Sequence, residues 1–107
     1  MTKVIDVGNE AQVKEQKISK KLVRDQELAD LKHLLSTPNG RRFIWRMMIW
    51  CGVFDINFYP DQDNLTNFKL GMRNIGLMLI DECDSADPSA YILMQQEAVA
   101  RKLREGR

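Results

Sequence analysis

The most regular pattern in this chain lies between residues 64 and 86. Apolar side chains recur there at spacings of 3, 4, 3, 4 and 4, a period typical of one helix face: Leu65, Phe68, Met72, Ile75, Leu79 and Cys83. Gly71 and Gly76 lie within this pattern, and each lowers the stability of the helix by about 1 kcal/mol relative to alanine. We therefore expect a neighbouring helix or backbone segment to pass close to them. The pattern predicts a helix from Asn64 to Ala86, capped by Asp63 or Asn64, with its stripe in the core.

Two proline-containing boundaries predict two further helices. Ser36 or Thr37 precedes Pro38, and Asp87 precedes Pro88; a polar cap followed by proline in the first turn is a typical helix start. The first boundary predicts a helix over residues 38–51 that Gly52 ends in a left-handed conformation, with one apolar side formed by Phe43, Ile44, Met47, Met48 and Cys51. The second predicts a C-terminal helix with Tyr91, Ile92, Ala98, Val99 and Leu103.

Residues 10–35 predict one long helix, or two helices broken near residue 26, because no Gly or Pro lies between Gly8 and Thr37. Its apolar positions broadly follow a helical stripe: Ile18, Leu22, Leu28, Leu31 and Leu35. The first half is so polar that it has few residues with which to join a core. We expect it to be an arm that is helical when docked, since isolated helices of this length are marginal in water.

A length of 107 residues suffices for one small core, so we expect a single domain. The predicted fold class is all-α: a compact bundle of three to four helices with a long polar N-terminal helical arm. Within it we distinguish a docking arm over residues 1–27, a helical core over residues 28–95 and a basic C-terminal helix end over residues 96–107.

Charge is balanced over the whole chain but not along it. Sixteen Lys and Arg face fifteen Asp and Glu, which gives a net charge of +1 and no global reason to expect a nucleic-acid or membrane-surface binder. Residues 36–51 carry three Arg and no acid, whereas residues 52–90 carry seven acids and two bases. This alternation favours a molecule that docks complementary faces, including faces of its own copies. No apolar run approaches the roughly 20 residues of a membrane span, and the start lacks signal-peptide features, which predicts a protein made and kept in the cytoplasm.

Catalytic and metal-binding patterns are weak. Cys51 and Cys83 have no CxxC or Cys/His spacing and are expected to be buried thiols. His33 lies in a helical run, and the acids of residues 81–84 read as a solvated helix end. No GxSxG, Walker, HExxH or EF-hand motif is present. We therefore predict a non-enzymatic protein with no cofactor, no metal and no small-molecule substrate.

Three arginines on the first two turns of the predicted second helix are the strongest interaction candidates. In one interpretation they bind phosphates or a partner's carboxylates while Trp45 offers a stacking plane; in the other they pair within the monomer with Asp55, Asp81 or Glu82. The aromatic residues of the following loop are candidates for anchoring a partner. The predicted partner-binding residues are Arg41, Arg42, Trp45, Arg46, Phe58, Tyr59 and Arg73.

Over residues 28–95 the chain resembles a family of small virion or assembly proteins of tailed bacteriophages, chiefly short-tailed, podovirus-like ones. The resemblance is carried by Thr37-Pro38, Gly40-Arg41-Arg42, Trp45, Cys51-Gly52-Val53-Phe54, and the series Gly71, Arg73, Asn74, Gly76 and Leu77. It implies a compact helical protein associated with the virion. It also implies signature polar positions at Gly40-Arg41-Arg42 and Arg73-Asn74, close packing at Gly71 and Gly76, and no catalytic residue.

The resulting hypothesis is a structural component of a phage particle, present in several copies around the portal, tail or internal core. Its expected partners are other virion proteins and copies of itself, and no membrane. Two alternatives stay open: a DNA-binding packaging or assembly factor that uses Arg41, Arg42 and Arg46, and a host-directed regulatory protein that uses Phe58 and Tyr59. Residues 52–63 form a connection too long for a standard helix-turn-helix, which weakens the DNA alternative.

Overall fold

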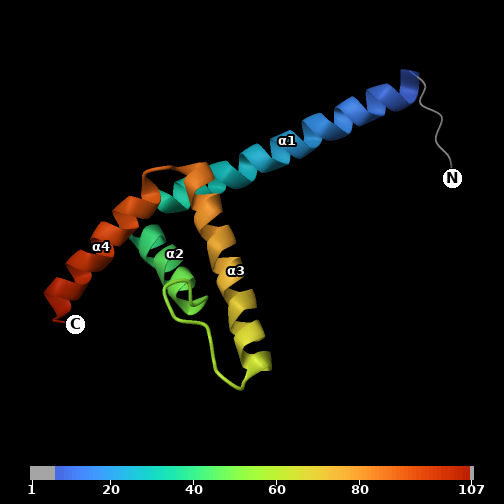
Figure 1. The fold of residues 1–107 in the computed structure, drawn as a ribbon. Helices are drawn as coiled ribbons and strands as arrows, with labels where there is room; N and C mark the ends of the chain where they lie inside the picture. The colour runs from blue at the N-terminus through green and yellow to red at the C-terminus, as the bar shows by residue number, and fades with distance from the viewer. Residues whose placement is uncertain (1–6, 107) are drawn as a thin grey trace.

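The computed structural model describes the backbone of residues 7–106 and the side chains from Asn9 onward; residues 1–6 of the predicted arm and Arg107 of the predicted tail lie outside the described residues. Four helices make up the fold, and the described part contains no strand: α1 (Val7–Leu35), α2 (Pro38–Trp50), α3 (Asp63–Ala86) and α4 (Ala90–Glu105) (Figure 1). The predicted all-α class is confirmed.

The boundary between α1 and α2 follows the prediction closely. Thr37 is the N-cap, its hydroxyl accepts a hydrogen bond from the Gly40 amide at 3.1 Å, and Pro38 occupies the first helical position, where its missing donor loses nothing. Gly52 has φ of +73°, as expected for the left-handed residue that ends a helix. The helix itself ends at Trp50, one residue before the predicted end.

The starts of α3 and α4 differ from the prediction. Gln62, not Asp63 or Asn64, is the N-cap of α3, and its side chain makes no capping hydrogen bond. At the second proline boundary, the Asp87 carboxylate accepts hydrogen bonds from the Ser89 amide at 3.1 Å and the Ser89 hydroxyl at 2.8 Å. These bonds close a turn around Pro88, so α4 begins only at Ala90.

Helix α1 is one continuous helix, and its first half projects away from the other three (Figure 1). Every side chain from Glu10 to Glu27 is exposed, whereas Leu35 is buried and Leu31 packs beside the core. The predicted single stripe is therefore wrong in its first half. Ile18 and Leu22 fall on a different side of the helix from Leu31 and Leu35 and face solvent, being 60% and 63% exposed.

The core is small and lies where the four helices converge. At that junction the C-terminal half of α1 and the C-terminal end of α3 meet the N-terminal ends of α2 and α4 (Figure 1). Its buried apolar members are Leu35, Ile44, Met48, Cys83, Ala90 and Met94. Leu79, Ile80, Trp45 and Tyr91 pack around them. Two of the six belong to α4, so residues past 89 help to close the core.

Several residues predicted to face the core are exposed instead. On α3, Phe68 and Ile75 are 63% and 61% exposed. The side of α3 that meets the rest of the molecule carries other members of the predicted stripe, which are half-buried or buried: Leu65, Met72, Leu79 and Cys83. On α2, Phe43 is exposed while Ile44 and Met48 are buried. On α4 the face turned inward carries Ala90 and Met94, which leaves three predicted stripe members in solvent: Ile92, Val99 and Leu103.

The two glycines of α3 have opposite surroundings. A Cβ on Gly76 would overlap the Val53 side chain and lie 2.8 Å from the Cys51 Cβ, so the predicted close approach is confirmed at this position. A Cβ on Gly71 would meet nothing within 4 Å, so the prediction is wrong there within the monomer. Gly40 is a third close approach, which the sequence did not indicate. A Cβ there would overlap the backbone carbonyl of Leu34, because the last turn of α1 lies against the first turn of α2 at the corner between them.

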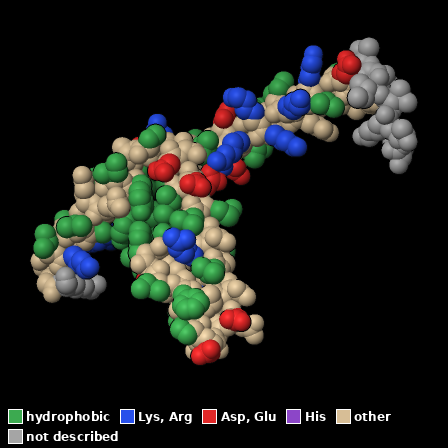
Figure 2. Space-filling view, viewed as in Figure 1, with side chains coloured by type: hydrophobic (Ala, Val, Ile, Leu, Met, Phe, Trp, Pro, Cys, Tyr) green, Lys and Arg blue, Asp and Glu red, His purple; other side chains and the backbone are tan. Residues whose placement is uncertain are grey.

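The molecule is elongated around its small junction. Its radius of gyration is 19.9 Å and its principal extents are 66 × 41 × 15 Å, whereas a compact domain of this length has a radius of gyration of about 13 Å. Helices α2 and α3 form a limb that points away from the junction, and hydrophobic side chains are visible along its surface (Figure 2).

Candidate functional site

Arg41 is held within the monomer. Its Nε and one terminal nitrogen donate to the two carboxylate oxygens of Glu97, both at 2.9 Å, and its other terminal nitrogen donates to the Leu35 carbonyl at 2.9 Å. The Arg41 and Glu97 side chains are only 11% and 26% exposed. One guanidinium thus joins the end of α1, the start of α2 and the middle of α4, and it satisfies a carbonyl that the end of α1 leaves unpaired.

Trp45 also belongs to the monomer's own packing. Its ring stacks on Phe54 with centroids 5.1 Å apart and lies 6.2 Å from the Tyr91 ring at a tilted angle. The residue is half-buried and packs against the core. It therefore fixes the start of the α2–α3 connection and the start of α4 against α2, with little of its ring face left for a partner.

The outward side of α2 carries an arginine between two aromatic rings. The Arg46 guanidinium carbon lies 5.3 Å from the Phe43 ring centroid and 5.2 Å from the Trp50 ring centroid, within cation–π range of both. All three residues are exposed, as is Arg42, whose terminal nitrogen donates to the Asn39 side chain at 3.0 Å. This set, Arg42, Phe43, Arg46 and Trp50, is hereafter the α2 outer face.

The remaining predicted site residues lie apart from one another. In the α2–α3 connection Phe58 is 67% exposed, whereas Tyr59 is half-buried and its backbone is fixed by two hydrogen bonds with the Thr66 hydroxyl. Arg73 is half-buried on α3, and no hydrogen bond or ion pair joins it to another described residue. The predicted pairing of arginines with Asp55, Asp81 or Glu82 is wrong: Arg41 pairs with Glu97, and Glu82 pairs with Arg24 of α1.

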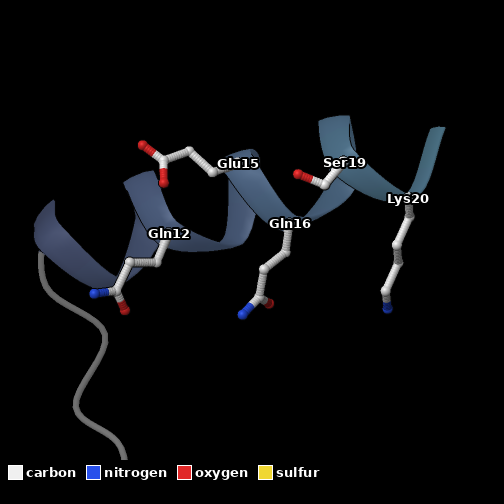
Figure 3. A pocket seen from close by; sticks show the side chains of 5 residues that line it. All are labelled: Gln12, Glu15, Gln16, Ser19 and Lys20. Atoms are coloured by element: carbon white, nitrogen blue, oxygen red, sulfur yellow. The ribbon is translucent and has the colours of Figure 1, made fainter. Parts of the chain in front are cut away.

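The hollow drawn in Figure 3, on the described part of the chain, contains none of these groups. The hollow in Figure 3 is lined by side chains of one exposed stretch of α1, which point to different sides of that helix: Gln12, Glu15, Gln16, Ser19 and Lys20. Among residues 7–106 no cluster of His, Cys, Asp and Glu has the arrangement of a metal site. The Cys83 thiol is buried, and burial raises its pKa to about 11, which leaves it protonated and unreactive at neutral pH.

The family model for Bbp19-like phage proteins matches residues 31–96. The chain belongs to this family. The match spans the end of α1, all of α2 and α3 and the first part of α4, so it covers every core residue, while the projecting half of α1 lies outside it. Comparison with curated proteins and with solved structures finds no match.

Over the residues that the structure describes, none of the helices of this Bbp19-like protein has the length and apolar character of a membrane span.

The Arg41–Glu97 pair of this Bbp19-like protein predicts a defined acid sensitivity. Hydrogen bonds from Arg41, followed by its charge, hold the pKa of Glu97 below its ordinary value. A depressed folded-state pKa stabilises the fold above the unfolded-state value of about 4.3, and that stabilisation is lost as the pH falls through the lower folded-state pKa. We therefore expect the difference in urea midpoint between wild type and Glu97→Gln to be large at pH 7 and to shrink below about pH 4. Glu10→Gln, on the exposed arm, is the control; a pH-independent difference for Glu97→Gln would contradict the prediction.

Proposed function

We propose that this Bbp19-like protein is a non-enzymatic structural component of the phage particle, present in several copies around the portal, tail or internal core. The observation that carries the proposal is the imbalance between its core and its surface. Among the side chains that the structure describes, six apolar residues are buried, whereas nineteen large hydrophobic ones are exposed, distributed over all four helices and the α2–α3 connection. A contiguous apolar patch on a soluble domain usually marks a site of contact, and three of these exposed side chains, Phe68, Ile75 and Met78, share one face of α3.

The shape of the molecule supports the same proposal. An elongated subunit with a projecting helix and a projecting limb has a large surface for its mass, and such surface stabilises an assembly when neighbours cover it (Figure 1). The α2 outer face adds two arginines and two aromatic residues, the residue types that are enriched at the centres of protein interfaces.

The copy number in purified particles tests the proposal. The protein is measured by quantitative mass spectrometry before and after gentle release of the genome. Retention in emptied particles at a fixed multiple is the expected result for a portal or tail component, and loss together with the DNA is expected for an internal-core component. Absence from particles under both conditions would reject the proposal and favour an assembly factor or a host-directed regulator.

A DNA-binding packaging factor is the second candidate, because Arg42 and Arg46 are exposed on one helix face. Phosphate contacts release counterions, so the affinity for duplex DNA would fall with salt at a logarithmic slope near −0.9 per phosphate neutralised. Measured binding with a slope of about −1.8 or steeper, which corresponds to two or more phosphates, would favour this candidate if it is lost in an Arg42→Gln, Arg46→Gln variant.

Deletion of residues 1–27 is expected to leave a folded core and to abolish incorporation into particles. The described residues of this segment contribute nothing to the core, and the ion pair of Arg24 with Glu82 on α3 is an exposed one of the kind that adds little stability. The measurement is the circular dichroism melting curve of the purified variant together with its content in particles grown from the mutant phage. Wild-type incorporation of the deleted protein would contradict the assignment of residues 1–27 as the docking arm.

A further inference from the structure

The side of α3 turned away from the junction has the shape of a helix-packing surface but no helix on it. Phe68, Ile75 and Met78 are 61–65% exposed there, at spacings that place them on one face. Gly71 lies among them, and a Cβ at Gly71 would meet nothing within 4 Å. Within the monomer this glycine weakens the helix without admitting any neighbour. A glycine between large apolar side chains forms a groove on the helix surface, and such a groove lets a second helix approach closely. These four residues are hereafter the α3 free face.

The projecting half of α1 is an unpartnered helix with a suitable surface. Ile18 and Leu22 form an exposed apolar pair at helical spacing, and Lys14 and Lys21 lie beside Ile18 at the i−4 and i+3 positions. Residues 9–24 carry five basic side chains against two acidic ones, and two of the five, Lys21 and Arg24, already pair with acids of the same chain. The segment therefore combines an apolar strip with a basic flank.

The projecting half of α1 is complementary in charge to the limb that carries the α3 free face, and the two helical segments are equal in length. Residues 55–68 hold three Asp and no Lys or Arg. In Figure 2 the basic side chains gather along the projecting half of α1, and acidic side chains lie at the far tip of the α2–α3 limb. Residues 9–24 and residues 63–78 each comprise sixteen helical positions, which corresponds to about 24 Å at 1.5 Å per residue.

We propose that the projecting half of α1 from one copy packs along the α3 free face of a second copy. Ile18 and Leu22 lie over Gly71 between Phe68 and Ile75, and Lys14, on the side of the tip, reaches toward the acidic end of the limb. The projecting half of α1 cannot pack on α3 of the same copy, because α1 diverges from α3 beyond the pair of Arg24 with Glu82 (Figure 1). The contact joins two different surfaces, so each copy offers one arm and one face, and the contact repeats head to tail into a ring or a filament. It deepens the proposed function by naming another copy of this chain as the arm's partner.

Sedimentation velocity of the full chain tests the contact. Wild type is expected to associate with rising concentration, and to associate less in 1 M NaCl because the charge pairs are screened. Two variants each remove one half of the contact: Ile18→Gln with Leu22→Gln on the arm, and Gly71→Lys on the face. Glutamine and lysine are good helix formers, so both variants stay helical and Gly71→Lys raises the thermal midpoint. Each variant alone is expected to associate at least tenfold more weakly than wild type.

Mixing the two variants gives the decisive result. The arm variant keeps an intact α3 free face and the face variant keeps an intact arm, so an equimolar mixture is expected to form a 1:1 complex that cannot extend. Val99→Lys, which adds a lysine at an exposed apolar position of α4, is the matched control and is expected to associate like wild type. An arm variant that associates like wild type would overturn the proposal in favour of contact between two α3 faces. Wild type that stays monomeric at millimolar concentration would also overturn it, while detection of that protein in particles would leave the virion assignment intact.

Discussion

Gly40→Ala is expected to destabilise the protein by about 3 kcal/mol, at the upper end of the usual range for overpacking. The added methyl would overlap the backbone carbonyl of Leu34, and a backbone atom cannot rotate out of the way as the end of a side chain can. The last turn of α1 would have to move relative to α2, which would disturb Leu35 in the core and the Arg41 contact with its carbonyl. Urea unfolding followed by circular dichroism measures the effect.

The same substitution at the two glycines of α3 provides the controls. Gly76→Ala is expected to lose about 1 to 2 kcal/mol, because the methyl meets Val53 and Cys51 but a valine side chain can shift. Gly71→Ala is expected to gain up to about 1 kcal/mol from helix propensity alone, since the position is open. Equal stability of the Gly40 and Gly71 variants would contradict the close approach of the last turn of α1 to the first turn of α2.

The positions of the helices could be predicted from the sequence because local signals determine them. Pro38 and the Thr37 hydroxyl define the start of α2, and Gly52 adopts the left-handed conformation after it. The apolar period of residues 64–86 gave α3 to within one residue. At Asp87 the local signal was ambiguous, because a carboxylate two residues before Ser89 can close a turn as well as cap a helix.

The buried faces of the helices could be predicted only in part: Ile44, Met48 and Cys83 are buried as predicted, but which other apolar positions are covered depends on where neighbouring helices pack. Phe68 and Ile75 have the period of a core stripe but lie on a part of α3 that no other helix covers. Two neighbouring arginines illustrate the same dependence on packing. Arg41 and Arg42 are consecutive on α2, yet Arg41 is bound to Glu97 inside the monomer and Arg42 faces solvent. No sequence signal identified Glu97 as the partner of Arg41, since 56 residues separate them.

The cations and tryptophans of α2 thus divide between two roles. Arg41 and Trp45 hold three helices and the α2–α3 connection together, whereas Arg46 and Trp50 face outward in cation–π contact. The family match covers both pairs. A Bbp19-like core therefore uses the inward side of α2 for its fold and leaves the α2 outer face exposed.

Arg41→Ala is expected to destabilise the protein by about 3 kcal/mol, because it removes three hydrogen bonds and leaves the half-buried Glu97 carboxylate and the Leu35 carbonyl without a partner. Arg42→Ala is the matched control: it removes an exposed arginine one residue away on the same helix and is expected to change stability by less than about 0.5 kcal/mol.

A double-mutant cycle with Glu97→Ala separates the two contacts that Arg41 makes. In the Glu97→Ala background the carboxylate contact is already gone, so Arg41→Ala is expected to lose only about 1 kcal/mol, the share of the bond to the Leu35 carbonyl. The coupling energy between Arg41 and Glu97 is then about 2 kcal/mol, measured from urea unfolding at pH 7. Additive losses, or an Arg41→Ala variant as stable as Arg42→Ala, would show that the three-helix junction does not depend on this ion pair.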